Sequence, residues 1–391
     1  MKDVFIVGAA RTPVGSFLGS LSTVPAPQLG AYAIKKAIEM ANVDKEKIDI
    51  VFMGNVVSAG IGQAPARQAL IYSGLSPSIP AVTVNKVCGS GMEAIIQGAR
   101  MIMLEEAEIV VAGGMENMSL APYGLTKART GYRMWNGELI DLMVFDGLWD
   151  PYQNKHMGMF AELCAEKYGF TREMQDQYAI ESYERALKAI KEGLFKDEIV
   201  PVEVKTKKET IVVEEDEEPK RLVKEKVPKL KPAFKPDGTV TAANASSIND
   251  GAAAVVLASE SSIKKYGLKP MVRLVSYGGF AQSSEWFTTS PIGATKKALE
   301  RAGLTTSDID LWEINEAFAV VAMAAIKELE LDHSIVNIKG SGCSIGHPIG
   351  CTGARIVVTL VHSMKQRNAK KGLATLCIGG GEALATIWEL V

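Results

Sequence analysis

Two stretches that lie far apart in the chain share one residue pattern. Residues 109–116 (IVVAGGME) and 375–382 (TLCIGGGE) are short apolar runs closed by glycines and a glutamate, which is typical of a buried strand followed by a tight turn. Each run follows a Gly-rich turn and a segment with apolar residues at helical spacing, Met92 to Ile102 and Ile356 to Met364. The repeated order predicts an internal duplication, with chance similarity of two Gly-rich segments as the alternative.

The composition is that of a globular α/β protein. The 391 residues allow two or three domains, and 47% of them are apolar while 23% are charged. The net charge of -2 provides no basic surface for nucleic acid or an anionic membrane. The longest apolar run, residues 317–326, is shorter than the roughly 18 residues of a membrane span, and the N-terminus lacks the apolar segment of a secretory signal. We expect a cytoplasmic protein with no nucleic-acid or membrane partner.

The spacing of cysteine and histidine argues against disulfides and metal sites. The five cysteines are odd in number and widely scattered, which makes a poor disulfide framework. The chain has no CxxC pair and no HExxH spacing, so we predict no zinc site. Cys164 and Cys351 are interpreted as packing residues, Cys343 as a small residue in a tight turn, and His362 as a surface residue.

The middle of the chain differs in character from the two halves. Residues 203–231 contain 17 charged residues, including the run Glu214 to Glu218, and are predicted to form a solvated excursion on the surface. Residues 171–193 have an N-cap threonine, an apolar face and a terminal glycine, and are predicted to form an amphipathic helix. The predicted division is an N-terminal half (1–118 and 250–268), an inserted loop domain (119–249) and a C-terminal half (269–391).

Cys88 lies where a predicted buried strand meets the N-terminus of a predicted helix, in the segment VTVNKVCGSGME (82–93). Unpaired N–H groups and the helix dipole stabilise a thiolate at such a place and lower the pKa of a cysteine. Cys88 is therefore a candidate nucleophile. The alternative is a small buried core residue, because free cysteine is among the most buried residue types.

Three further segments carry groups that could act with this thiol. His347 lies on the irregular loop GHPIG (346–350), where backbone turns would hold a base in position. Asn315 follows an apolar strand in NEAF (315–318), at a strand end where α/β sites usually open. Cys377 stands immediately before a run of glycines whose N–H groups are free to bind an oxyanion.

One alternative for the last third of the chain is a dinucleotide site. Residues 336–342 (VNIKGSG) could begin a GxGxxG motif. The third glycine of that motif would fall at Ile345, and no helix starts cleanly through His347 and Pro348. We reject this interpretation because the required strand, turn and helix context is missing.

The segments VNKVCGSGMEA, NEAF, GHPIGCTGA and CIGGGEA occur in the order and spacing found in thiolases, and the chain resembles that family over essentially its whole length. The resemblance implies an α/β fold of two similar βαβ-rich halves, with mixed sheets in α/β/α/β/α layers and an inserted loop domain. It implies that Cys88 accepts the acyl group, that His347 activates Cys88, and that Cys377 is a second acid/base. One oxyanion hole would be a water on Asn315 together with His347, and the other would be the backbone N–H groups of Cys88 and Gly379.

The implied activity is that of a biosynthetic-type acetyl-CoA C-acetyltransferase, which joins two acetyl-CoA molecules to acetoacetyl-CoA and CoA by a reversible Claisen condensation. A thiol suits the acyl-enzyme, and a second thiol suits abstraction of the α-proton. Nothing in this cycle transfers electrons or requires a metal, so no cofactor is expected, and CoA and the acyl-CoA compounds are substrates. Members of this type are usually homotetramers, and we expect the same here.

The resemblance also implies contacts with the CoA arm or the acyl group, and the HMG triplet (156–158) favours short acyl chains. For Lys220 and Arg221, which lie in the charged run, the alternative to a phosphate contact is a solvated position on the surface. Two departures concern the pocket: Phe287 replaces a methionine that many bacterial members carry, and GSGCSI (340–345) replaces a more usual GGAIA. The expected contact residues are His156, Met157, Lys220, Arg221, Phe234, Ser246, Phe287, Ala317 and Phe318.

Two other functions compete with this interpretation. A degradative 3-ketoacyl-CoA thiolase would act on longer chains beside other enzymes of β-oxidation. A thiolase-like lipid-binding or scaffold protein would keep the fold without the chemistry. The presence of Cys88, His347 and Cys377 argues against the second of these, because a carrier needs none of them.

Overall fold

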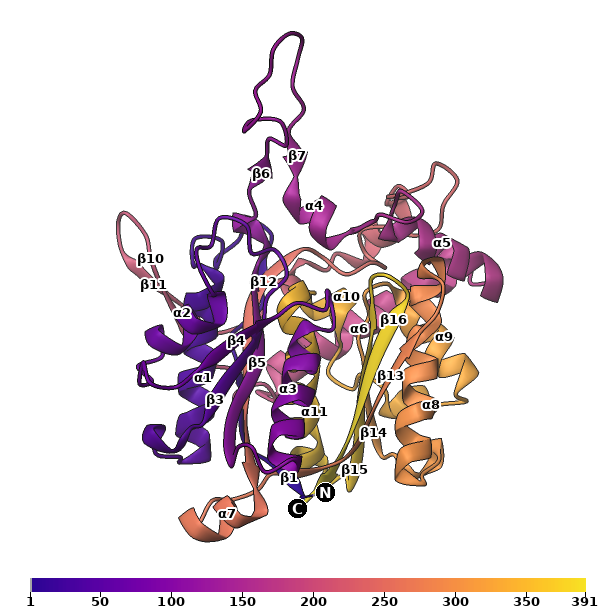
Figure 1. Ribbon diagram of the computed structural model, residues 1–391. Helices are drawn as coiled ribbons and strands as arrows, with labels where there is room; N and C mark the ends of the chain where they lie inside the picture. The colour runs from indigo at the N-terminus through magenta and orange to yellow at the C-terminus, as the bar shows by residue number, and fades with distance from the viewer. Residues whose placement is uncertain (1) are drawn as a thin grey trace.

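The computed structural model describes residues 2–391, and a mixed ten-stranded sheet forms its centre (Figure 1). The strand order is β14-β15-β16-β13-β1-β12-β5-β3-β4, with the short β2 beside β12. The strands are β1 (Val4–Arg11), β2 (Gly15–Ser16), β3 (Ile50–Gly54), β4 (Ala81–Val84), β5 (Ile109–Asn117), β12 (Asn249–Ser259), β13 (Val272–Ala281), β14 (Leu311–Ile314), β15 (Lys371–Ile378) and β16 (Glu382–Leu390).

The two halves of this sheet repeat one topology. In the first half β1 is antiparallel to β12 and β12 to β5, while β5 is parallel to β3 and β3 to β4. In the second half β13 is antiparallel to β16 and β16 to β15, β15 is parallel to β14, and a parallel bridge from Trp312 to Val336 takes the place of the last strand. The halves meet where Phe5 and Ile6 of β1 pair with β13. The predicted internal duplication is confirmed.

Two helices lie between the halves, and further helices cover the outer faces of the sheet (Figure 1). Helices α3 and α11 contact each other, α3 packs on β3 and β5, and α11 packs on strands of both halves. On the outside, α1 packs on β1 and β12, α2 on β3 and β4, and α8 on β13 and β16. The helices are α1 (Ala26–Ala41), α2 (Pro65–Tyr72), α3 (Ser90–Met103), α4 (Leu142–Gly147), α5 (Met157–Tyr168), α6 (Arg172–Lys191), α7 (Glu260–Tyr266), α8 (Ser290–Ala302), α9 (Ala319–Glu328), α10 (Gly342–Ile345) and α11 (Ile349–Arg367).

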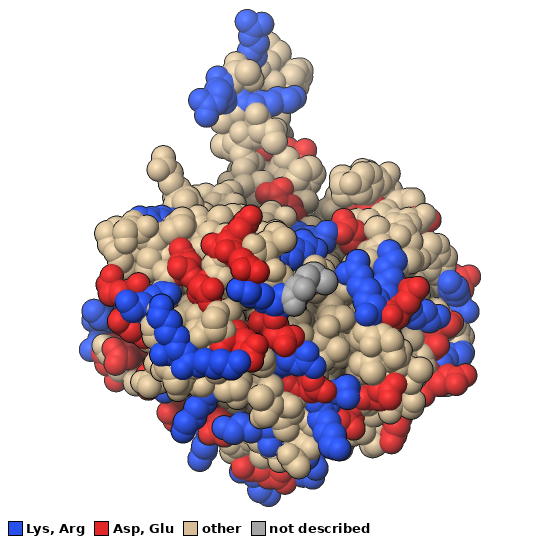
Figure 2. All heavy atoms as spheres, turned by 60° about the horizontal axis from the view of Figure 1, so that its bottom comes forward, with Lys and Arg blue, Asp and Glu red and all other residues tan. Residues whose placement is uncertain are grey.

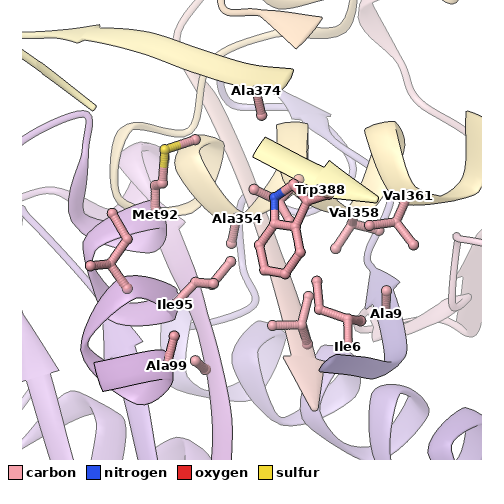
Figure 3. Close-up of a cluster of buried hydrophobic side chains, with 14 of the residues drawn as sticks. Ile6, Ala9, Met92, Ile95, Ala99, Ala354, Val358, Val361, Ala374 and Trp388 are labelled. Atoms are coloured by element: carbon pink, nitrogen blue, oxygen red, sulfur yellow. The ribbon is translucent and has the colours of Figure 1, made fainter. Parts of the chain in front are cut away.

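The main hydrophobic core fills the space around these two central helices (Figure 3). Met92 and Ile95 of α3 and Val358 and Val361 of α11 are buried in it beside Trp388 of β16. The first sixteen residues of α11 are all buried, as expected for a helix that has protein on every side. His362 lies on this helix, so our assignment of His362 to the surface is wrong: it is buried, and its Nε2 lies 2.9 Å from the carbonyl oxygen of Ala9.

The chain leaves the sheet between β5 and β12, which pair directly with each other. This excursion holds α4, α5, α6 and a hairpin that projects from the body of the molecule (Figure 1). The predicted helix over 171–193 is confirmed as α6, and Met174 N–H donates to the capping Oγ1 of Thr171 at 3.2 Å. The short strands of the excursion are β6 (Tyr123–Gly124), β7 (Ile140–Asp141), β8 (Trp149–Asp150), β9 (Lys155–His156), β10 (Val202–Lys205) and β11 (Thr210–Val213).

The acidic run in the excursion is not simply solvated, so that prediction is wrong for part of it. Asp216 is fully buried and accepts two hydrogen bonds from Arg11, at 2.7 and 2.9 Å, while Glu217 accepts from Ser16 N–H. Asp216 is buried because it pairs with Arg11, a buried cation on β1 that lies far away in the sequence. The face seen in Figure 2 intermixes acidic and basic side chains. Within residues 2–391, no helix is both long and apolar enough to traverse a bilayer.

Candidate active site

A cavity of about 220 Å³ lies where the two halves and the excursion meet. Its wall draws residues from the N-terminal ends of α3, α5 and α11 and from the loops that follow β14 and β15. The polar groups are few, and the rest of the wall is apolar, as is usual for small-molecule sites. Ten of the predicted site residues contribute to it: Cys88, His156, Met157, Phe234, Ser246, Phe287, Ala317, Phe318, His347 and Gly379.

A strained turn presents Cys88 to this cavity. Val87 has a φ of 46°, which is unusual for a β-branched residue. Ser90 holds the turn, because its Oγ accepts from Lys86 N–H at 2.9 Å and donates to the carbonyl of Val87 at 2.6 Å. A Cβ on Gly89 would lie 2.3 Å from the Cδ1 atom of Ile378, so the glycine lets the end of β15 pack closely on this turn.

The electrostatics of Cys88 differ from our expectation of a lowered pKa. Burial raises the pKa of the Cys88 thiol to about 11, while the N–H groups of Gly379 and of Cys88 itself act in the opposite direction. Burial outweighs the helix end because a thiolate loses more hydration than these donors restore. The N–H groups of Cys88 and Gly379, which the sequence assigns to the second oxyanion hole, therefore lie near the Cys88 sulfur.

His347 lies across the cavity as a neutral imidazole. Burial and the positive charge of Arg355 lower the pKa of His347 to about 3. Its backbone N–H donates to Asn249 Oδ1 at 2.9 Å. Gly346 precedes it with a φ of 111°, and a Cβ there would lie 2.4 Å from the same amide oxygen. Glycine is required at that position, and the loop therefore places His347 as the sequence suggested.

Cys377 and Asn315 are fully buried and do not line this cavity. Cys377 is fully buried at the end of β15, in one apolar cluster with Met157, Phe287 and Phe318 of the wall. Burial raises its pKa well above the usual value, and the neighbouring Cys88 adds to this. Both polar side-chain atoms of Asn315 are buried without a hydrogen-bond partner in the described chain 2–391. Such an amide is suited to hold a water or a substrate oxygen.

Aromatic rings shape the apolar end of the cavity. Phe287 is only 3% exposed and packs edge-to-face on Phe160 and Phe318, with ring centroids 6.4 and 6.3 Å apart. His156 stacks on Phe234 at 4.7 Å, and its Nδ1 accepts from Gly158 N–H. The Nε2 of a neutral His156 therefore carries the proton and can donate a hydrogen bond.

The two basic residues expected at the CoA nucleotide lie outside the cavity. The side chain of Lys220 pairs with Glu215 at 2.5 Å, and that of Arg221 pairs with Glu218 at 3.3 Å. Both basic side chains are exposed on the surface, where a phosphate could exchange with these carboxylates.

Several wall residues were missed by sequence reasoning, because nothing in their local pattern distinguishes them from core or loop residues. They are Met118, Gly147, Leu148, Ala245, Ser247, Ile248 and Ile349.

Glu116 was also missed, although it closes the repeated glycine pattern. Its carboxylate is fully buried and accepts hydrogen bonds from Asn55 Nδ2, from the N–H groups of Val56 and Val57, and from Gly350 N–H. Burial raises the pKa of Glu116 to about 7. The side chain therefore joins the end of β3 to the start of α11, beside the loop that carries His347.

The cavity thus brings together the thiol of Cys88, the neutral imidazole of His347 and the N–H groups of Cys88 and Gly379. On a duplicated α/β scaffold, these features define an acyltransferase. Family models for the thiolase N-terminal domain and the thiolase C-terminal domain match residues 4–261 and 268–390. The chain belongs to the thiolase family.

Curated relatives match over nearly the full length. The acetyl-CoA acetyltransferase of Pseudomonas aeruginosa is 50% identical over 387 residues, covering 98% of each chain. The acetyl-CoA acetyltransferase of Escherichia coli is also 50% identical and covers 100% of this chain and 99% of its own. Among solved structures, the Acat5 thiolase of Ascaris suum in complex with coenzyme A is 46% identical, with a TM-score of 0.95 over 100% of both chains.

Iodoacetamide is expected to alkylate Cys88 before any other cysteine. Cys88 borders the cavity, while the other four described cysteines are buried. Because its pKa is raised to about 11, the thiolate fraction and the rate should rise about tenfold per pH unit from about pH 7 to 10. Mass spectrometry after brief treatment measures the order of labelling, and acetyl-CoA should protect Cys88. First labelling of Cys343 or Cys164, with activity lost in step, would contradict the assignment.

Proposed function

We propose that this protein is an acetyl-CoA C-acetyltransferase that works through an acetyl-Cys88 intermediate. The observation that carries the proposal is the meeting of Cys88, His347 and the Gly379 N–H group at one small, largely apolar cavity. The acetyl-CoA acetyltransferases related to it at about 50% identity over the full length support the substrate assignment, as does the CoA complex of its structural neighbour.

In the first half-reaction, Cys88 attacks the carbonyl carbon of acetyl-CoA. His347 takes the thiol proton at Nε2, which is free to accept because it has no hydrogen-bond partner among residues 2–391. The N–H groups of Cys88 and Gly379 stabilise the oxyanion. The C–S bond to CoA then breaks, and the departing CoA sulfur takes a proton from Cys377. His347 is left protonated and Cys377 as a thiolate.

In the second half-reaction, a second acetyl-CoA enters and Cys377 removes its α-proton. The raised pKa of Cys377 makes its thiolate a strong base. Protonated His347 and a water on the unpartnered Asn315 amide stabilise the enolate oxygen. The enolate carbon attacks acetyl-Cys88, acetoacetyl-CoA leaves, and the Cys88 sulfur recovers its proton from His347. The cycle balances without electron transfer, so we expect no prosthetic group and no metal requirement.

The inserted domain, residues 119–249, is proposed to bind the CoA arm. His156, Met157, Phe234 and Ser246 border the cavity from this segment. Ala317 lines it beside Ser246, whose N–H donates to the Ala317 carbonyl at 3.0 Å. Lys220 and Arg221 are proposed to contact the phosphates of the nucleotide end.

The test of the proposed activity is the rate of cleavage of acetoacetyl-CoA with free CoA, compared with the rates for 3-ketoacyl-CoAs of longer chain. Faster turnover of long chains than of acetoacetyl-CoA would replace this proposal with the degradative alternative.

Phe287 is expected to set tolerance for a methyl group at the acyl α-carbon. The flat ring offers a different wall from the flexible thioether of methionine, and we hypothesise that the wild type cleaves 2-methylacetoacetyl-CoA as well as acetoacetyl-CoA. A methyl in an apolar pocket changes specificity by about 1–3 kcal/mol, so Phe287→Met should lower the relative rate of the branched substrate about 5- to 160-fold. The measurement is kcat/KM for both substrates. An unchanged ratio, or no turnover of the branched substrate by the wild type, would remove Phe287 from this role.

We propose a homotetramer for the assembled protein. The projecting hairpin supports this, because its segment between β6 and β7 exposes 76% of Met134 and 89% of Trp135. Figure 2 shows that the same projection carries basic side chains. A projection that is both apolar and basic is typical of a contact with another protein chain.

We also propose a cytoplasmic location. Five free cysteines within the described residues favour a reducing compartment. A relative from Gibberella zeae, 50% identical over the full chain, carries the word cytosolic in its name.

A further inference from the structure

The imidazole of His347 has one engaged and one unengaged nitrogen. Its Nδ1 lies 2.6 Å from Thr352 Oγ1, while Nε2 is buried without a hydrogen-bond partner among residues 2–391. The residue borders the cavity that contains Cys88. A neutral imidazole carries its single proton on one nitrogen only. Nε2 can therefore accept the Cys88 proton only while the ring proton stays on Nδ1.

Thr352 is placed to keep the proton on that nitrogen. Its hydroxyl has one hydrogen and two lone pairs, and Oγ1 also lies 2.9 Å from the carbonyl oxygen of Pro348, a group that can only accept. When the hydroxyl donates to this carbonyl, Oγ1 is left as an acceptor for Nδ1–H. The side chain of Thr352 is fully buried, so bulk water does not compete for the contact.

We propose that Thr352 is a positioning residue that holds His347 in the tautomer able to accept the Cys88 proton. The inference rests on the proposed function, because it takes Cys88 as nucleophile and His347 as base. The charged groups that act on His347 and Cys88 are Arg355 on α11 and Glu116 at the end of β5, and the thiol of Cys377 also lies beside Cys88. The orienting group is thus a neutral hydroxyl rather than a carboxylate. A cysteine is compatible with this because a thiol needs less activation than a serine hydroxyl.

The matched variants Thr352→Val and Thr352→Ser test this role. Valine preserves the shape but removes the acceptor, whereas serine keeps the hydroxyl. Single-turnover acetylation of Cys88 by acetyl-CoA, followed by mass spectrometry, should be slowed about 10- to 50-fold in Thr352→Val, a part of what a general base contributes. The KM for acetyl-CoA should stay within about twofold, since the hydrogen bond orients a base. The acetylation rate of Thr352→Ser should stay within about threefold of the wild type, because serine keeps the hydroxyl that accepts from Nδ1–H.

His347→Ala separates failure of this inference from failure of the proposed function. If His347→Ala acetylates Cys88 at the wild-type rate, His347 is not the base and the proposed function itself fails. If His347→Ala is slow while Thr352→Val keeps the wild-type rate, the role of Thr352 is overturned. A Thr352→Ser variant as slow as Thr352→Val overturns it as well, because the hydroxyl is retained. Thr352→Ala also lacks the hydroxyl and must show the same loss, which provides a second measurement if the valine variant does not fold.

Discussion

Cys377→Ala is expected to accept an acetyl group on Cys88 yet fail to form or cleave acetoacetyl-CoA. The first half-reaction still has its nucleophile and base in this variant, and CoA can leave as a thiolate that takes its proton from protonated His347 instead of from Cys377. The second half-reaction requires a group that moves the α-proton, and the buried thiol of Cys377 is the group assigned to it. Loss of a general acid/base should lower turnover by at least about 100-fold.

Two measurements distinguish these half-reactions: the mass of acetylated enzyme after mixing with acetyl-CoA, and steady-state cleavage of acetoacetyl-CoA. Cys164→Ala is a matched control, because Cys164 is buried in the same apolar cluster and has no assigned role. It should keep turnover within about threefold, since it removes only packing. Loss of both half-reactions in a folded Cys377→Ala protein would show that the two thiols do not have distinct roles.

Asp216→Ala is expected to reduce the free energy of unfolding by about 3–5 kcal/mol, because it removes one of the two carboxylates that pair with a buried cation. Arg11 and Asp216 are both fully buried and share two hydrogen bonds. Glu198 also contacts Arg11, but it lies 3.5 Å from Lys339 as well. Without Asp216, the buried cations Arg11 and Lys339 therefore share the single carboxylate of Glu198. Urea denaturation of the wild type and the variant measures the difference.

The neighbouring residue provides the control for this prediction. Glu215 belongs to the same acidic run, but its ion pair with Lys220 is about half exposed. Glu215→Ala should change the free energy of unfolding by at most about 1 kcal/mol, because water screens the pair. Equal and small effects of the two substitutions would show that the Arg11 contact contributes little net stability.

Local patterns in the sequence were sufficient for the class of the fold and for the motif residues. The duplication could be predicted because each half contains the same order of glycine turn, helix and buried strand. The spacing of apolar residues indicates which side of an element is buried. His347 could be selected because a Gly-His-Pro-containing loop cannot be a helix interior. The helix over 171–193 was predictable for a similar reason: its threonine cap and terminal glycine are local signals.

The properties that depend on distant partners were not predictable in this way. Cys88 was expected to have a lowered pKa from its helix end alone, but burial by segments remote in sequence raises that pKa. Asp216 was expected to be solvated, but it pairs with Arg11 of β1. His362 was expected to be exposed, but the two halves of the sheet enclose α11. Glu116 ends a repeated motif, yet its four hydrogen bonds come from the loop after β3 and from α11.

The sequence by itself determined which segments become strands, helices and glycine turns, and which side chains can perform acyl transfer, because these depend on backbone geometry and on the chemistry of single residues. Only the tertiary structure decided which of those side chains meet at a cavity, which do not line it, and which charged groups are buried. The physical reason is that desolvation and hydrogen bonding act through space. Their strength at Cys88, His347 or Arg11 depends on neighbours that arrive from the other half of the chain.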